Sequence, residues 1–171
     1  MDKLNEAFTN LEISEAFGLA IKVEEDGYTL YQKTIEMTDN PRAKEDLEFL
    51  RDQEKGHKVF FEKLLKDTGK EYKADSESAL YVWVKENLMA PIQKAIENNT
   101  LQSFHAVLSI GMELEKKSIQ FYKQLKNAAD SKENKKAINK IIKEEKRHQK
   151  FLKFIIKYSN LGDGSSALWN D

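Results

Sequence analysis

Two stretches of the chain carry the same pair of residue types at the same spacing. LRDQEKGHKVFF (50–61) contains Glu54-x-x-His57, and IIKEEKRHQKFL (141–152) contains Glu145-x-x-His148. A shift of 91 residues relates both pairs, in a chain with only three histidines. Positions i and i+3 share one face of an α-helix, so each pair can direct both side chains at one point. The duplication therefore predicts two equivalent helices with inward-facing polar residues.

The same shift also holds in the segments that precede these pairs. VEEDGYTLY (23–31) falls on LEKKSIQFY (114–122), which matches Glu24 to Glu115 and Tyr31 to Tyr122. One ungapped shift thus aligns two successive helical segments in each half of the chain. We interpret this as an internal duplication of a helical hairpin.

Apolar residues at helical spacing predict four long helices, over about residues 10–38, 41–67, 101–128 and 132–158. Asn40 followed by Pro41 predicts the start of the second helix, and Ser131 caps the fourth. Residues 68–100 form a crossover containing a shorter helix that Pro91 kinks or splits, and 159–171 form an irregular tail. The expected fold is a single all-α domain over 1–171, a four-helix bundle of two hairpins.

The composition excludes several functional classes. With 28 Lys and Arg against 29 Asp and Glu, the net charge is −1, and this near-neutral balance argues against a nucleic-acid binder. The absence of cysteine excludes disulfides, thiolate catalysis and iron–sulfur clusters. MDKLNEAFTN lacks the apolar core of a signal peptide, and no stretch approaches the roughly 18 apolar residues of a membrane span. We therefore expect a cytoplasmic protein with no membrane partner.

The repeat also distinguishes acids that occur in both halves of the chain from acids that occur in only one half. Glu25 falls on Lys116, and Glu144 falls on Gln53, so neither acid is duplicated. His105 falls on a serine and is expected to be a surface or packing residue. The acids and histidines retained in both halves are Glu24, Glu54, His57, Glu115, Glu145 and His148.

Four carboxylates and two imidazoles gathered inside a bundle predict a pair of divalent cations. Four buried glutamates without cations would be prohibitively costly, and two divalent ions supply four positive charges. Oxygen-rich ligation with some imidazole suits iron or manganese. Phe60 and Phe151, three residues after each histidine, predict an aromatic wall around the cluster, and Tyr31 and Tyr122 are first of all core aromatics.

One glutamate from each of two helices, plus Glu-x-x-His from each of the other two, is the pattern of ferritin-like di-iron carboxylate proteins. AIKVEEDGYTLY, LRDQEKGHKVFF, GMELEKKSIQFY and IKEEKRHQKFL resemble the rubrerythrin-like branch, over about residues 9–158. The resemblance implies that Glu54 and Glu145 bridge two metals, and that each metal has one terminal glutamate and one histidine. These terminal and capping ligands would be Glu24, Glu115, His57 and His148. Tyr31 and Tyr122 would hydrogen-bond ligands or lie by the oxygen-binding face.

The chain also departs from the full rubrerythrin pattern. It has no cysteine-rich rubredoxin-like domain, and Met112 stands where the family tends to carry an extra glutamate. The resemblance implies a redox protein that reduces peroxide or O2 at two iron ions, with electrons from a separate donor protein. Manganese or a mixed iron–manganese pair remains an alternative, as does a non-enzymatic metal-binding or iron-handling role. A homodimer is expected.

Overall fold

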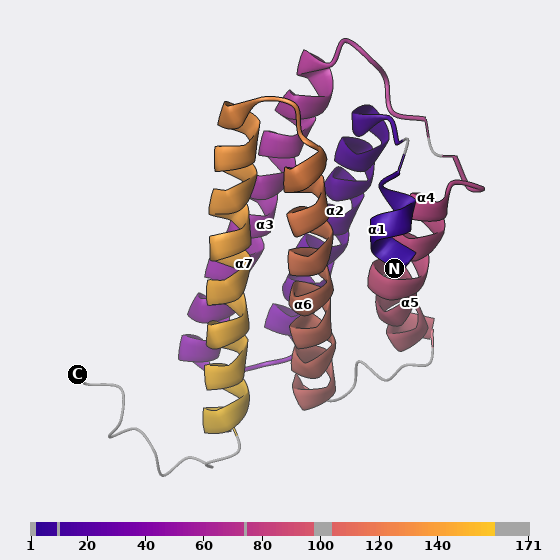
Figure 1. Cartoon of the computed structure of the whole chain (residues 1–171). Coiled ribbons are helices and arrows are strands. Elements are labelled where there is room, and N and C mark those ends of the chain that lie inside the picture. The colour runs from indigo at the N-terminus through magenta and orange to yellow at the C-terminus, as the bar shows by residue number, and fades with distance from the viewer. Residues whose placement is uncertain (1–2, 10, 74, 98–103, 160–171) are drawn as a thin grey trace.

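The computed structural model describes residues 3–9, 11–73, 75–97 and 104–159, and these contain helices and no strand. Four long helices form a bundle, with a chain of short helices beside it (Figure 1). The all-α prediction is confirmed. The elements in chain order are α1 (Lys3–Ala7), α2 (Ile13–Glu36), α3 (Pro41–Asp67), α4 (Ala79–Val84), the π-helix η1 (Lys85–Met89), α5 (Ala90–Glu97), α6 (Phe104–Ala128) and α7 (Lys132–Ser159).

Side-chain caps fix where the second helix of each hairpin begins. The Asn40 side-chain oxygen accepts from the backbone N–H groups of Arg42 at 3.0 Å and Ala43 at 3.1 Å, with Pro41 starting α3. The Ser131 hydroxyl accepts from the Asn134 N–H at 3.0 Å in front of α7. Each cap satisfies backbone donors that have no partner within the helix. Both predicted caps are therefore observed at corresponding positions of the repeat.

The ends of the elements differ in places from the expected ranges. The first long helix begins at Ile13, after Glu12 at the N-cap position, which makes no side-chain capping bond. The short α1 before it was not anticipated, because five residues are too few to show a helical period. The expected start of the third helix at 101 and the expected tail beyond Ser159 lie outside the described residues.

Pro91 does not split the crossover helix. The chain runs from α4 through the π-helix into α5, and the N–H of Ala90 bonds to the carbonyl of Lys85, five residues earlier. Proline lacks an N–H and crowds the preceding turn, and a wider π turn provides room for it within a continuous helix. The elements α4, η1 and α5 therefore form one continuous helical segment, which packs beside α2 and α6.

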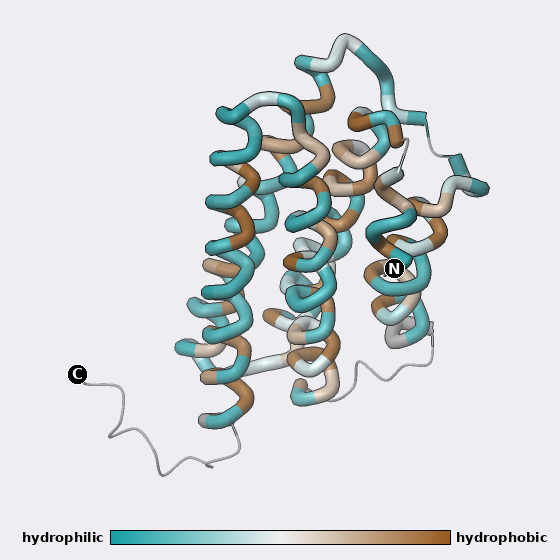
Figure 2. The backbone as a smooth tube through the Cα atoms, in the orientation of Figure 1, coloured by the Kyte–Doolittle hydropathy of each residue, from teal (hydrophilic) through white to brown (hydrophobic). Residues whose placement is uncertain are grey.

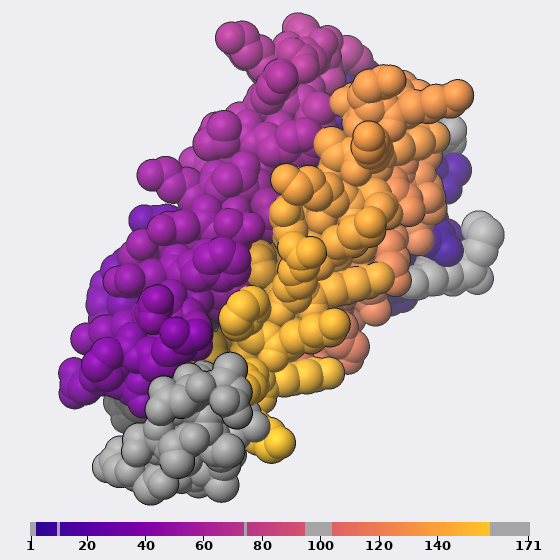
Figure 3. Space-filling model, turned by 90° about the vertical axis from the view of Figure 1, so that its left-hand side faces the viewer, coloured from indigo at the N-terminus to yellow at the C-terminus, as the bar shows by residue number. Residues whose placement is uncertain are grey.

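Apolar side chains form two clusters within the bundle. One contains Phe17, Phe61 and Tyr122, with many aliphatic residues from the short helices. The other contains Leu47, Leu108 and Leu152. Hydrophobic and hydrophilic residues alternate along each long helix (Figure 2), so each helix turns an apolar stripe inward and a polar face outward. Figure 3 shows the face on which α3 and α7 lie side by side.

No helix among the described residues has the length and apolar character needed to cross a membrane.

Glycine at position 18 allows the crossover to pack against α2. A Cβ added to Gly18 would lie 2.1 Å from the first ring carbon of Tyr72, which follows α3. Real Cβ contacts are never this short, and the atom involved is at the base of the ring rather than at a flexible tip. An alanine would therefore push Tyr72 away from the bundle.

We expect Gly18→Ala to lower the free energy of unfolding by about 1–3 kcal/mol, as overpacking does. Gly56→Ala is the matched control, because nothing lies within 4 Å of its added Cβ on the exposed side of α3. Better helix propensity should raise the control's free energy of unfolding by up to about 1 kcal/mol. Urea denaturation measures both, and equal stability of the two variants would contradict this packing.

Candidate metal centre

The residues retained by the repeat lie together in the middle of the bundle. Each long helix contributes: Glu24 from α2, Glu115 from α6, and one Glu-x-x-His pair from each of α3 and α7. All six residues are between 1% and 5% exposed. Charged residues are almost never this buried unless they are paired or bind a metal. The helical spacing therefore brings the six residues into one enclosed polar cluster, as the sequence predicts.

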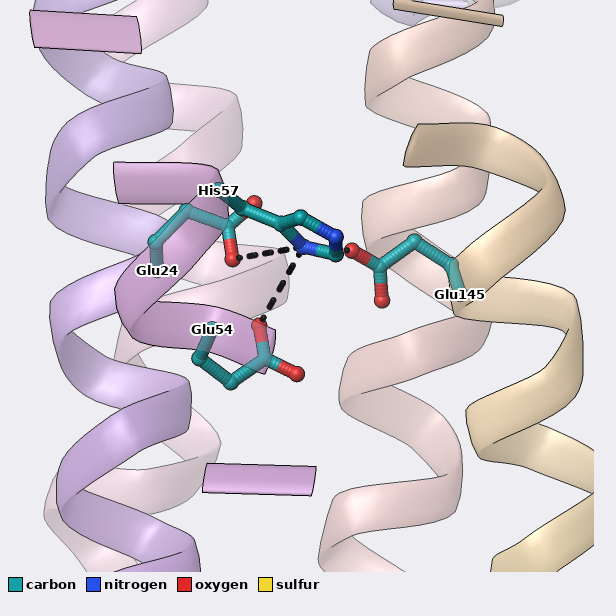
Figure 4. A group of neighbouring side chains, drawn as sticks. All are labelled: Glu24, Glu54, His57 and Glu145. Carbon is teal, nitrogen blue, oxygen red and sulfur yellow. Dashed lines mark ion pairs between the residues drawn. The ribbon is translucent and has the colours of Figure 1, made fainter. Parts of the chain in front are cut away.

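Half of this cluster surrounds His57, and Figure 4 shows its four side chains pointing toward one another. The His57 Nδ1 atom lies 3.0 Å from Glu145 Oε1, 3.4 Å from Glu24 Oε2 and 3.9 Å from Glu54 Oε2. One ligand atom from each residue falls within 4.8 Å of the others. Such a group of three oxygens and one nitrogen can hold a metal ion.

The other half repeats this arrangement around His148. Its Nδ1 atom lies 3.1 Å from Glu54 Oε1, 3.3 Å from Glu145 Oε2 and 3.4 Å from Glu115 Oε1. These four residues form a second group within the same 4.8 Å limit, and Glu54 and Glu145 belong to both groups. The two histidine rings stack with centroids 5.8 Å apart. Two adjoining metal positions with two shared carboxylates therefore fit this geometry.

The predicted tyrosines link the two hairpins reciprocally. The Tyr31 hydroxyl on α2 donates to Glu115 Oε1 on α6, and the Tyr122 hydroxyl on α6 donates to Glu24 Oε1 on α2. Burial and then the neighbouring carboxylate raise the pKa of each phenol well above its usual value. The tyrosines therefore stay protonated and hold one oxygen of each carboxylate, leaving the other oxygen free.

The cluster has strongly perturbed proton affinities. Burial, followed by the charge of Glu145, raises the pKa of Glu54 and Glu115 well above the usual range. Burial alone lowers the pKa of the His57 imidazole, but the Glu24 and Glu145 carboxylates outweigh it and raise the pKa to about 12. The pKa of His148 rises for the same reason. Without metals, protons therefore balance the negative charge of the cluster.

Unsatisfied polar atoms provide a test of whether metals fit. In the part of the chain that the structure describes, every buried side-chain nitrogen or oxygen without a hydrogen-bond partner belongs to one of the six clustered residues. They are Glu24 Oε2, Glu54 Oε1, His57 Nδ1, Glu115 Oε2, Glu145 Oε1 and both ring nitrogens of His148. Buried polar atoms normally have partners. Apart from His148 Nε2, these atoms are carboxylate and imidazole donors that face one cluster, and such a donor set suits iron or manganese.

Sequence reasoning missed one functional contact, that of Glu144. Its Oε2 atom lies 3.1 Å from Nε2 of His57, across the interface between α7 and α3. In a neutral, metal-binding imidazole, an Nε2–H that donates to this carboxylate would leave the Nδ1 lone pair directed to the cluster, as in many metal-binding histidines. The repeat hid this role because position 53 is glutamine. His148 Nε2 has no hydrogen-bond partner, so the two halves differ here.

Other residues singled out from the sequence lie outside the cluster. His105 is half-buried beside Phe104 and belongs to neither ligand group. Met112 is half-buried against the apolar cluster that contains Leu108 and Leu152. Phe60 and Phe151 are half-buried, whereas the fully buried Phe61 stacks on Tyr122 at 5.2 Å. The innermost aromatic wall thus includes Phe61, one position away from the expected phenylalanine.

The fold and the cluster together define a ferritin-like carboxylate protein. A crystal structure from Thermotoga maritima, described as that of a ferritin-like diiron-carboxylate protein, matches with a TM-score of 0.65 and 24% identity, over 87% of this chain and 97% of that one. No curated protein matches the sequence. The family model for rubrerythrin matches residues 15–156, and the chain therefore belongs to the rubrerythrin family.

We expect Glu144→Ala to weaken binding of one metal ion by roughly 10–100-fold, the usual effect of losing a partner of a ligating histidine. Gln53→Ala is the matched control at the equivalent position of the repeat, and it should leave both affinities unchanged. Competition titration of the metal-free protein with Mn2+ and a chelating dye measures the affinities. Wild-type binding by Glu144→Ala would show that the contact does not orient His57.

The histidine pKa values give the metal-free protein a defined pH dependence. Above about pH 6.5 an unfolded histidine is neutral, whereas folded His57, with a pKa of about 12, keeps its proton. A raised folded pKa contributes stability that is lost as the pH rises toward it. Burial raises the pKa of Glu145, but hydrogen bonds with Glu115 and the two histidines lower it well below its usual value. The contribution of Glu145 to the free energy of unfolding therefore changes only in acid. The free energy of unfolding should thus fall above pH 6.5, by at most about 1.4 kcal/mol per pH unit for each extra bound proton.

Urea denaturation of the metal-free protein at three pH values between 6.5 and 8.5 measures this fall. Protein saturated with Mn2+ is the control, and its trend should be weaker or reversed because metals displace these protons. Stability that rises with pH in the metal-free protein would contradict the assignment.

Proposed function

We propose that this protein is a redox protein that reduces peroxide or O2 at a pair of metal ions, using electrons from a separate donor protein. The observation that supports it most is the pair of overlapping ligand groups that share Glu54 and Glu145. Two metal positions with common carboxylates allow both ions to act on one small oxidant. Membership of the rubrerythrin family agrees with this function.

In this proposal each ligand has a role that follows from its place in the cluster. Glu54 and Glu145 would bridge the two ions, because each belongs to both groups. Glu24 and Glu115 would be terminal ligands, and the Nδ1 atoms of His57 and His148 would each hold one ion. A bound pair of iron ions would supply the electrons that reduce the oxidant, and the external donor would replace them. Manganese, alone or with iron, fits the same donors.

The chain's own residues prepare the site for this chemistry. The Tyr31 and Tyr122 hydroxyls hold Oε1 of Glu115 and Glu24, so that the terminal carboxylates keep one orientation. Their raised pKa keeps the phenolic protons in place at neutral pH. The apolar clusters limit the access of water, which strengthens electrostatic interactions within the cluster. The proposal also includes that the protein forms a homodimer and that it receives electrons from a separate protein.

A non-enzymatic role in metal binding is the second candidate. The observation that favours it is the enclosure of the ligands, which are at most 5% exposed. A metal pair in such a place stabilises the folded state even without turnover. The two functions differ in whether the reduced metal pair reacts quickly with peroxide.

Glu54→Ala and Glu145→Ala test the proposal. Each variant removes one bridging carboxylate, so we expect about one iron or none per chain in place of two, and loss of peroxide-driven oxidation of the ferrous protein by more than about tenfold. Glu113→Ala, on the exposed side of α6, is the control for the loss of a carboxylate.

Iron content per chain and the absorbance change after peroxide is added to the anaerobic ferrous protein are the measurements. Two irons and full reactivity in both variants would overturn the ligand assignment. Two irons in the wild type with no reaction toward peroxide or O2 would favour the non-enzymatic role.

A further inference from the structure

We propose that a pocket between α2 and α3 is the port through which divalent cations reach the metal centre. This inference rests on the proposed metal site and adds the path by which it is loaded. The pocket has a volume of about 420 Å³, and Glu24 and Glu54 form part of its wall together with charged residues of the surface. It therefore connects two of the proposed ligands with the outside of the hairpin.

The inner end of the pocket offers an unsatisfied ligand atom. Glu24 and Glu54 are 1% and 4% exposed, and Glu24 Oε2 has no hydrogen-bond partner. Glu54 Oε1 lies 3.1 Å from His148 Nδ1, on the side of the metal centre. A cation that enters the pocket thus meets two buried carboxylates that belong to the proposed ligand groups.

The outer end of the pocket carries further oxygen donors on α2. Glu25 and Asp26 line it, with side chains 39% and 23% exposed. Divalent cations give up bound water most readily when carboxylate oxygens replace it. Glu25 and Asp26 therefore provide an intermediate step between the hydrated ion outside and the buried ligands inside.

Lysines hold these acids in the absence of a divalent cation. Lys58 Nζ lies 2.8 Å from Glu25 Oε1, and Lys22 Nζ lies 3.5 Å from Glu25 Oε2 and 3.9 Å from Asp26 Oδ1. An arriving cation must displace these ammonium groups, which are partly exposed and can move to solvent. Lys55 lines the same pocket. The three lysines therefore oppose cation passage until they move aside, whereas Glu25 and Asp26 favour it.

The repeat indicates that the port is built on one hairpin only. Lys116 and Lys117 stand at the positions equivalent to Glu25 and Asp26, and Glu113 stands at that of Lys22. The second hairpin therefore has one carboxylate where the first has two, and that carboxylate is paired with Lys116. The inner ligands are common to both halves, but the acidic path toward them is not.

The test measures the rate at which metal-free protein takes up Co2+, a probe that undergoes no oxidation under these conditions. Stopped-flow mixing follows the ligand-field absorption of bound Co2+, and its final amplitude gives the number of ions per chain. We expect Glu25→Gln with Asp26→Asn to slow uptake by about tenfold, and Lys58→Gln to speed it, with unchanged amplitude.

Glu113→Gln is the control for a lost surface carboxylate, because it removes one negative charge from an exposed i,i+3 pair with Lys116 on another helix. Uptake by the Glu25→Gln and Asp26→Asn double variant that is no slower than uptake by this control would overturn the port. No Co2+ uptake by the wild type would overturn both the port and the metal centre on which it rests.

Discussion

The burial of four carboxylates and two imidazoles at the centre of the bundle is the constraint on which the rest of the structure depends. Such a cluster is unfavourable unless its charge is balanced, and protons on histidine and glutamate provide that balance without metals. Metals can replace these protons at the same atoms, since the histidine Nδ1 atoms and glutamate oxygens that attract protons are also ligand donors. Protons and cations can therefore replace one another at these donor atoms, and apolar packing between the surrounding helices keeps the donor atoms in place.

The duplication explains most of this architecture, and its exceptions explain the rest. The inner positions agree in both halves. Tyr31 donates a hydrogen bond to Glu115 of the other hairpin, and Tyr122 donates one to Glu24 in return. The outer positions have diverged. Glu144 holds His57 from outside, whereas the equivalent position near His148 is glutamine. The symmetric part of the site thus faces the ligand cluster, and the asymmetric part lies on its outer side.

The repeat made much of the fold and cluster predictable because helices turn a sequence spacing directly into a spatial one. Asn40 and Ser131 could be identified as caps from local chemistry alone. Glu144 could not be identified in this way, because its contact joins α7 to α3 and depends on how two helices pack. The π turn before Pro91 was also hidden, since it is a backbone response to proline rather than a property of residue types.

Family membership does not by itself fix the chemistry of the site, and Met112 shows why. The position faces an apolar cluster with Leu108 and Leu152, so the methionine contributes packing where a glutamate would contribute charge. A glutamate at this position would be a fifth carboxylate in addition to the four glutamates of the cluster. Among the described residues, the donors form two equivalent groups, each with its own histidine. Any difference between two bound ions would therefore arise from their surroundings, and Glu144 on the outer side of His57 is the clearest such difference.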